Sequence, residues 1–255
     1  MEKMNKYLQI IYILWLRQIK RYYRSRARMI GSLAQPVLFL VALGFGFGPI
    51  YQKAGGGNYI QFIAPGIISM SIIFTAMFAG IEVIYDRQFG FLKETLVAPV
   101  PRWTIMLGRT LGGATVATFQ GIVVFLIAIL VGFRPESILL APLALIFMSL
   151  IAILFTAFGT AIASKMEDMQ AFPLIINFLI MPLFFLSGAL FPLNGLPRAI
   201  QTIVYINPLS YGVDGIRGIL SNEMHFNLHA DFFVLAAFAT IFLALGSYLF
   251  SKIEV

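Results

Sequence analysis

The sequence predicts an all-α integral membrane protein with six transmembrane helices, an N-terminal amphipathic helix at the membrane interface and an outer re-entrant helical hairpin before the last span. Composition is the first observation: 60% of the 255 residues are hydrophobic and 11% are charged, against about 45–50% and about 25% in soluble domains. The second is a set of six uncharged stretches, each about as long as the ~20 residues that a helix needs to cross a bilayer. The third is an uneven distribution of Lys and Arg. Together these observations exclude a soluble enzyme.

The uncharged stretches predict where the spans lie. They cover residues 29–52, 54–81, 110–133, 137–164, 169–197 and 232–251. Allowing for turns at their ends, we expect transmembrane helices near residues 29–50, 59–82, 105–132, 138–163, 170–192 and 231–251. Residues 29–255 would then form one transmembrane domain, preceded by a separate segment of residues 1–28.

The positive charge of the chain is divided unevenly between the two sides of the membrane. When the loops are assigned alternately to the two sides, one side holds 14 Lys and Arg residues. The other side holds four, which are Lys53, Arg134, Arg198 and Arg217. Because Lys and Arg concentrate on the cytoplasmic side, we expect both termini in the cytoplasm and the chain in the cytoplasmic (inner) membrane. This asymmetry accounts for most of the net charge of +7, so we expect no nucleic acid partner.

The segment 1–28 contains an amphipathic helix that is too charged to cross the membrane. On a helical wheel, basic side chains of residues 4–24 fall within about 100° of arc; they are Lys6, Arg17, Lys20, Arg21 and Arg24. Apolar and aromatic side chains, Trp15 and Tyr22 among them, lie opposite. We expect this cytoplasmic helix to lie in the interface, with its aromatic face in lipid and its basic face toward lipid head groups or a protein partner. The alternative is a basic flank that only fixes the topology.

The loop of residues 83–104 contains a second short helix. Between Asp86 and Ala98 the sequence allows about three helical turns, and Pro99 and Pro101 then end the helix. A short helix held between two spans can transmit force to or from a cytoplasmic partner. The alternative is a turn that only connects the spans.

The segment before the last span contains two apolar pieces that are each too short to cross. Residues 197–206 and 209–220 are separated by Asn207 and Pro208. We expect a re-entrant or surface-lying helical hairpin over about residues 194–221, since broken helices are tolerated at membrane depth where protein surrounds them. A folded outer loop without a role in transport is the alternative.

The chain carries no recognisable catalytic motif. It lacks the G-x-x-x-x-G-K-[ST] phosphate loop and contains no Cys, and its two histidines, His225 and His229, lie in the outer loop. We therefore expect no catalytic residue, no metal site and no cofactor in this chain. No ionisable residue falls in the middle of a predicted span, whereas ion-coupled transporters place such groups there. The amides nearest the bilayer centre, Gln120 and Asn177, either line a substrate path or form hydrogen bonds between helices.

Two longer patterns give the chain a family resemblance. The loop after the second span reads Asp86-Arg87-x-x-Gly90-Phe91-x-Lys93-Glu94-x-Leu96-x-Ala98-Pro99-x-Pro101-Arg102. The outer segment reads Asn207-Pro208-Leu209-Ser210-Tyr211-x-x-Asp214-x-x-Arg217-Gly218. With the basic N-terminal helix and six spans, these patterns resemble the ABC-2 type permeases, the membrane subunits of type V ABC exporters, in the branch of drug-resistance and nodulation exporters.

The resemblance implies roles for particular residues. Residues 86–101 would form a coupling helix that docks on a separate ABC ATP-binding subunit, and residues 4–24 a connecting helix that touches the same subunit. The coupling residues that it implies are Asp86, Arg87, Phe91, Glu94, Leu96, Pro99 and Arg102. The residues that it implies in the outer hairpin, which would cap the transport pathway, are Asn207, Pro208, Tyr211, Asp214 and Arg217.

The resemblance also implies an assembly and an activity. Two permeases would combine with two ATP-binding subunits, which bind the ATP and Mg²⁺, so the expected partners are those subunits, a second permease copy and membrane lipids. A homodimer is favoured over a heterodimer with a similar permease, and the pathway would lie between the two permeases. The expected function is export of an amphiphilic, drug-like, lipid or glycolipid substrate. A passive channel or secondary transporter, and a membrane partner of an ATPase that carries nothing, are the alternatives.

Overall fold

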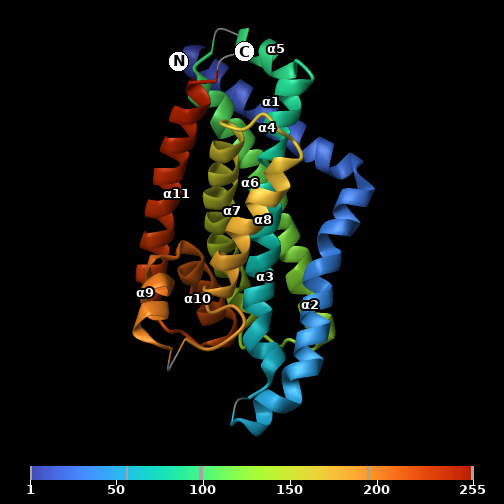
Figure 1. Cartoon of the computed structure of the whole chain (residues 1–255), viewed down its shortest axis with the longest axis vertical. Helices are drawn as coiled ribbons and strands as arrows, with labels where there is room; N and C mark the ends of the chain where they lie inside the picture. Colours follow the sequence, from blue (N-terminus) through green and yellow to red (C-terminus); the bar gives the residue numbers. More distant parts are fainter. Residues whose placement is uncertain (1, 56, 98–99, 194–195, 254–255) are drawn as a thin grey trace.

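The computed structural model describes residues 2–55, 57–97, 100–193 and 196–253, and its regular structure within these ranges is helical throughout. The elements in chain order are α1 (Glu2–Arg24), α2 (Arg26–Lys53), α3 (Tyr59–Phe78), α4 (Ile81–Gln88), α5 (Phe91–Val97), α6 (Arg102–Val131), η1 (Ile138–Leu140), α7 (Ala141–Ala163), α8 (Ala171–Phe185), α9 (Arg198–Ile206), α10 (Pro208–Ser221) and α11 (Leu228–Ser251). The long helices form a bundle. Helix α1 lies across the end of the bundle near both chain termini, and α9 and α10 lie in its other half (Figure 1).

Five helices in the described residues are long and apolar enough to cross a membrane. They are Arg26–Lys53, Tyr59–Gln88, Arg102–Val131, Ile138–Ala163 and Leu228–Ser251. These helices coincide with five of the six predicted spans. The second is longer than predicted, because α4 continues the direction of α3 as far as Gln88.

The predicted span at residues 170–192 is shorter than expected. Its helix, α8, has 15 residues, fewer than the ~20 that cross a bilayer core. The chain leaves the helix after Phe185 and turns at Gly188, whose φ of 73° is in the left-handed region that glycine enters without steric cost. A six-span topology therefore depends on how this segment sits in the membrane.

Helix α3 lies at the centre of the bundle. In the helix Tyr59–Gln88, 72% of the residues in an apolar stretch of 18 residues are buried. The corresponding share is 17% in each of α2 and α11. Helices α2, α6, α7 and α10 all pack on α3. Large apolar side chains such as Leu38 and Phe45 on α2 and Phe233 on α11 are exposed, which leaves these helices free to contact lipid or another chain.

Glycines allow α3 and α7 to approach within backbone contact. A Cβ added at Gly159 would collide with the backbone of Met77, and one at Gly80 with the backbone of Gly159. Small residues permit such close approach between transmembrane helices, where van der Waals packing is a main source of stability.

We expect Gly159→Ala to destabilise the bundle, because the added methyl meets backbone atoms that cannot rotate away. Overpacking of this kind costs about 1–3 kcal/mol. The midpoint of thermal unfolding of the purified protein, followed by circular dichroism in detergent, should fall.

Gly46→Ala is the matched control for this prediction. Gly46 lies inside α2, and an added Cβ there meets no atom within 4 Å. Alanine also favours the helix over glycine by about 1 kcal/mol, so the midpoint should stay level or rise. Equal midpoints for the two variants would contradict the close approach of α3 and α7.

Candidate functional site

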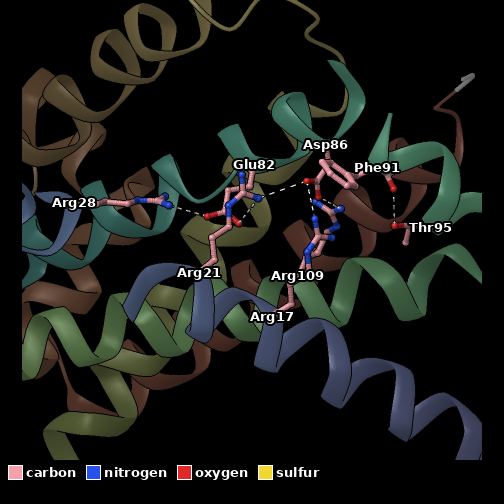
Figure 2. A network of polar contacts seen from close by, with 8 residues as sticks. All are labelled: Arg17, Arg21, Arg28, Glu82, Asp86, Phe91, Thr95 and Arg109. Carbon is pink, nitrogen blue, oxygen red and sulfur yellow. Dashed lines mark hydrogen bonds and ion pairs between the residues drawn. The ribbon is translucent and has the colours of Figure 1, made fainter. Parts of the chain in front are cut away.

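A cluster of ion pairs around two buried carboxylates joins four helices (Figure 2). The carboxylate of Asp86, on α4, accepts hydrogen bonds from Arg17 of α1, at 2.9 Å, and from Arg109 of α6. Arg21 of α1 lies 3.5 Å from the same carboxylate. Both Asp86 and Arg109 are almost fully buried, so each neutralises a charge that water cannot reach.

Glu82 extends the cluster to α2. It lies one turn before Asp86 on the same face of α4, and it pairs with Arg28 of α2 at 2.8 Å and with Arg21 at 3.8 Å. Within the described residues, the cluster therefore sets four guanidinium groups, those of Arg17, Arg21, Arg28 and Arg109, against two carboxylates.

Three members of this cluster were not predicted as site residues: Glu82, Arg28 and Arg109. A signal for Glu82 is present in the sequence, because Glu82 and Asp86 are four residues apart, as are Arg17 and Arg21. Such spacing places each pair on one face of a helix. Pairing the two faces, however, requires knowing that α1 folds back over α4.

The apolar face of α1 packs on α6. A Cβ at Gly108 would meet Leu14 and Ile11 of α1, so this glycine lets the two helices touch. The indole of Trp15 donates a hydrogen bond to the hydroxyl of Thr115 at 3.0 Å. The expectation that this aromatic face lies in lipid is therefore corrected. The face packs against small residues of α6, Gly108 and Gly112 among them, instead of lipid.

The two candidate amides have different surroundings. Gln120 is buried on α6, and its oxygen accepts a hydrogen bond from the hydroxyl of Tyr22 at 2.7 Å. This bond connects two helices, which is one of the two roles expected of it. Asn177 is half-buried on α8 and has no side-chain hydrogen bond to other described residues.

The predicted coupling helix is divided into two helices. Helix α4 ends at Gln88, Gly90 turns the chain with a φ of 79°, and α5 begins at Phe91. Residue Asp86 thus belongs to the buried end of a membrane helix and presents almost no surface to a partner. The expected single helix from 86 to 101 is corrected accordingly, since glycine in the left-handed region ends a helix.

Two more predicted coupling residues hold helices of the chain together. Arg87 pairs with Glu167 at 3.7 Å and donates to the carbonyl oxygen of Met166, which ties α4 to the turn after α7. Arg102, at the start of α6, donates to the carbonyl oxygens of Ser251 and Ile253 at the end of α11.

Helix α5 presents the accessible part of the predicted coupling segment. Phe91 and Glu94 are exposed, while Leu92 between them is buried. The Phe91 ring lies 6.0 Å from the guanidinium of Arg17 on α1. Leu96 lies in α5, and Pro99 lies outside the described residues.

A basic and aromatic hollow opens between α1 and the α4–α5 turn. Its volume is about 570 Å³. It is lined by four cations, one carboxylate and several apolar or aromatic side chains: Arg17, Lys20, Arg21, Arg24, Asp86, Ile13, Leu16, Tyr85, Phe89 and Phe91. The remaining predicted cation of α1, Lys6, is exposed nearer the N-terminus. We call this surface the basic hollow; its excess positive charge favours an acidic partner.

The residues predicted in the outer hairpin form hydrogen bonds with backbone groups of the hairpin and of α8. The Asn207 side chain accepts from the backbone N–H of Leu209, which caps α10, and donates to the carbonyl oxygen of Leu183. Pro208 occupies the first position of α10, where its missing N–H costs nothing. The hydroxyl of Tyr211 donates to the carbonyl oxygen of Tyr205.

Asp214 and Arg217 fix α10 to its neighbours. The Asp214 carboxylate accepts from the backbone N–H groups of His225 and Phe226, each at 2.8 Å. Arg217 donates to the carbonyl oxygens of Phe62 and Gly188 and lies 4.2 Å above the Phe62 ring. Burial lowers the pKa of Arg217 to about 10, so the guanidinium keeps its charge at neutral pH.

Comparison with known proteins connects both regions to one family. The family described as ABC-2 type transporter matches residues 9–221, which include the ion cluster and the outer hairpin. Nodulation protein J of Rhizobium leguminosarum bv. trifolii is 31% identical over 196 residues, 76% of this chain and 74% of that protein. The inner membrane transport permease YadH of Escherichia coli (strain K12) is 30% identical over 220 residues, 84% of each chain. The putative transport permease ycf38 of Cyanophora paradoxa is 28% identical over 224 residues, 85% of this chain and 76% of that protein.

We expect Asp86→Asn to loosen α1 and destabilise the bundle. The amide cannot neutralise Arg109, and leaving a buried charge without its partner costs about 3–5 kcal/mol. Because the chain has no Cys, a single Leu14→Cys probe reports on α1. Maleimide should label this buried position faster in the Asp86→Asn background, and the midpoint of thermal unfolding should fall.

Glu94→Gln is the control, since it removes the same charge from an exposed position on α5. Its unfolding midpoint and labelling rate should match those of the unmodified chain. If both substitutions leave the labelling rate unchanged, the carboxylate of Asp86 does not hold α1 in place.

Proposed function

The chain belongs to the ABC-2 type transporter family, and from that premise we propose that this multi-pass transport permease is the membrane subunit of an ATP-driven exporter. A separate ABC ATP-binding subunit would supply the ATP site and its Mg²⁺. The cargo would be amphiphilic: a drug-like molecule, a lipid or a glycolipid. The absence of a phosphate loop from the sequence supports a division of labour between two chains.

The basic hollow is the observation that carries this proposal. It combines cations with exposed aromatic side chains beside α5, and a binding surface for a protein partner typically has aromatic and Arg side chains at its centre. Lys20 and Arg24 are exposed and form no ion pair with other described residues. In this proposal α1 is the connecting helix and α5 the coupling helix, and both contact the ATP-binding subunit.

The ion cluster supports a mechanical role for that contact. A displacement of α1 would act on α4 through Asp86 and Glu82, and a displacement of α5 would act on α4 through the short turn at Gly90. Helix α4 in turn continues the central helix α3. Arg87 carries the same displacement to the turn after α7. Closure of the ATP-binding subunits would therefore shift packed helices as a rigid body, which is a common way to convert binding energy into motion.

Exposed apolar side chains on α2 and α8 support assembly with a second permease. Leu38 and Phe45 on α2 and Leu174 and Phe178 on α8 are exposed apolar side chains. We propose that two permeases, identical copies in the simplest case, enclose the pathway and bind two ATP-binding subunits. Both termini lie at the end of the bundle where α1 and α5 lie (Figure 1), and residues of these helices line the basic hollow. If that hollow binds the ATP-binding subunit, this end faces the cytoplasm, and the protein lies in the cytoplasmic membrane.

We expect the double charge reversal Lys20→Glu with Arg24→Glu to weaken binding of the ATP-binding subunit by about tenfold or more, because like charges across an interface repel. Affinity should be measured by co-purification and by titration of permease nanodiscs with the cognate subunit. Raising the salt concentration should weaken the unmodified complex in the same direction.

The control is Lys53→Glu with Arg134→Glu. It makes the same change of net charge at exposed positions at the far end of the bundle, and it should leave the affinity unchanged. Equal affinities for both double variants would reject the basic hollow as the docking surface. Solute movement through the purified permease without nucleotide would instead support a passive channel or secondary transporter.

A further inference from the structure

A second cavity lies on the other side of α1 from the basic hollow. It has a volume of about 510 Å³ and is lined by residues of α1, α2, α3, α4 and α6. We call it the inner cavity. Arg21 and Tyr85 line both spaces and separate them. Its volume falls within the range of about 300–1,000 Å³ that small-molecule sites occupy, and neither the ion cluster nor the docking of a partner accounts for it.

On the helix Tyr59–Gln88, the lining of the inner cavity changes from apolar to charged along one direction. Met70, Phe74, Phe78 and Glu82 line it at every fourth residue, so they form one stripe along the continuous helix Tyr59–Gln88. Over these 12 residues the stripe extends about 18 Å, at 1.5 Å per residue. The cavity is therefore elongated, with an apolar end and a charged end, as an amphiphile is.

Positive charge is in excess at the charged end. Arg21 comes from α1 and Arg28 from α2, and both pair with Glu82. The cluster as a whole holds two more guanidinium groups than carboxylates. The side chains of Arg21 and Arg28 are 39% and 37% exposed, so each retains donors for a further partner. Guanidinium groups bind phosphate and carboxylate groups with paired hydrogen bonds.

We propose that the inner cavity binds an amphiphile whose anionic head group, a phosphate or a carboxylate, is held by Arg21 and Arg28. Its apolar chain lies along Met70, Phe74 and Phe78. Basic pockets between transmembrane helices bind anionic lipid head groups in this way. A bound head group bridges α1 and α2, so occupancy of the cavity stabilises the docked position of α1.

The experiment uses the purified permease in nanodiscs of neutral lipid and a fluorescent single-chain analogue of phosphatidic acid as the probe. Binding is measured without nucleotide and without the ATP-binding subunit, so its result is independent of the exporter proposal. Saturable binding supports the site. Arg21→Gln with Arg28→Gln should weaken it by about tenfold or more, since charge-assisted hydrogen bonds are lost.

Glu82→Gln provides a test with the opposite sign. It removes the carboxylate that competes for both arginines, so the probe should bind several-fold more tightly. If these arginines only maintained the fold, this substitution would weaken binding or leave it unchanged. Either of those outcomes overturns the assignment of the head-group site.

A steric test does not disturb the ion pairs. Gly31 lines the inner cavity, and an added Cβ there meets no atom within 4 Å, so Gly31→Leu should fold normally and block the probe. Gly46→Leu, on the same helix and equally open but outside the cavity, should bind the probe as the unmodified chain does. Unchanged binding by Gly31→Leu overturns the proposal even if the arginine variant does not fold.

Competition identifies the chemistry of the ligand. Displacement of the probe by oleate or by unlabelled lysophosphatidic acid, but not by lysophosphatidylcholine, supports an anionic amphiphile and ranks its carboxylate and phosphate forms. Inorganic phosphate alone should displace the probe at least tenfold less effectively, because it lacks the chain. Equal displacement by inorganic phosphate or by the zwitterionic lipid overturns the proposal.

Discussion

The buried pair of Asp86 and Arg109 is the interaction on which this end of the bundle depends. Neither charge reaches water, so α4 and α6 cannot separate without leaving one of them unpaired, at a cost of several kcal/mol. Arg17 and Arg21 attach α1 to the same carboxylate, and Glu82 adds α2 through Arg28. Two carboxylates on one face of a short helix therefore hold the positions of four helices.

The continuous helix Tyr59–Gln88 is tied to arginines of other helices near both of its ends. At one end, Arg217 of α10 donates to the carbonyl oxygen of Phe62. At the other, Asp86 and Glu82 engage the arginines of α1, α2 and α6. Between these points the helix is surrounded by α2, α6, α7 and α10. In the proposed mechanism, motion imposed near α1 would therefore be carried along this packed helix.

The structure separates residues that build the permease from residues that remain open to partners. Asp86, Arg87, Arg102, Asn207, Asp214 and Arg217 all bind backbone or charge within the chain. Phe91, Glu94, Lys20 and Arg24 are exposed beside one hollow. A family pattern in the sequence thus combines two kinds of residue. The distinction matters for mutagenesis, because a substitution of the first kind would act mainly by damaging the fold.

The sequence alone determined the features that depend on local chemistry. Apolar lengths placed five of the spans, and Asn207 and Pro208 predicted the break between α9 and α10, because hydrophobicity and proline act on the residues next to them. Tertiary structure alone decided that Trp15 packs on α6 instead of lipid, that Asp86 pairs with Arg17 across 69 positions of the chain, and that α8 stops at Phe185. These outcomes depend on which helices become neighbours. The type of a charged or aromatic residue does not specify its partner, because the partner comes from a distant part of the chain that only folding brings close.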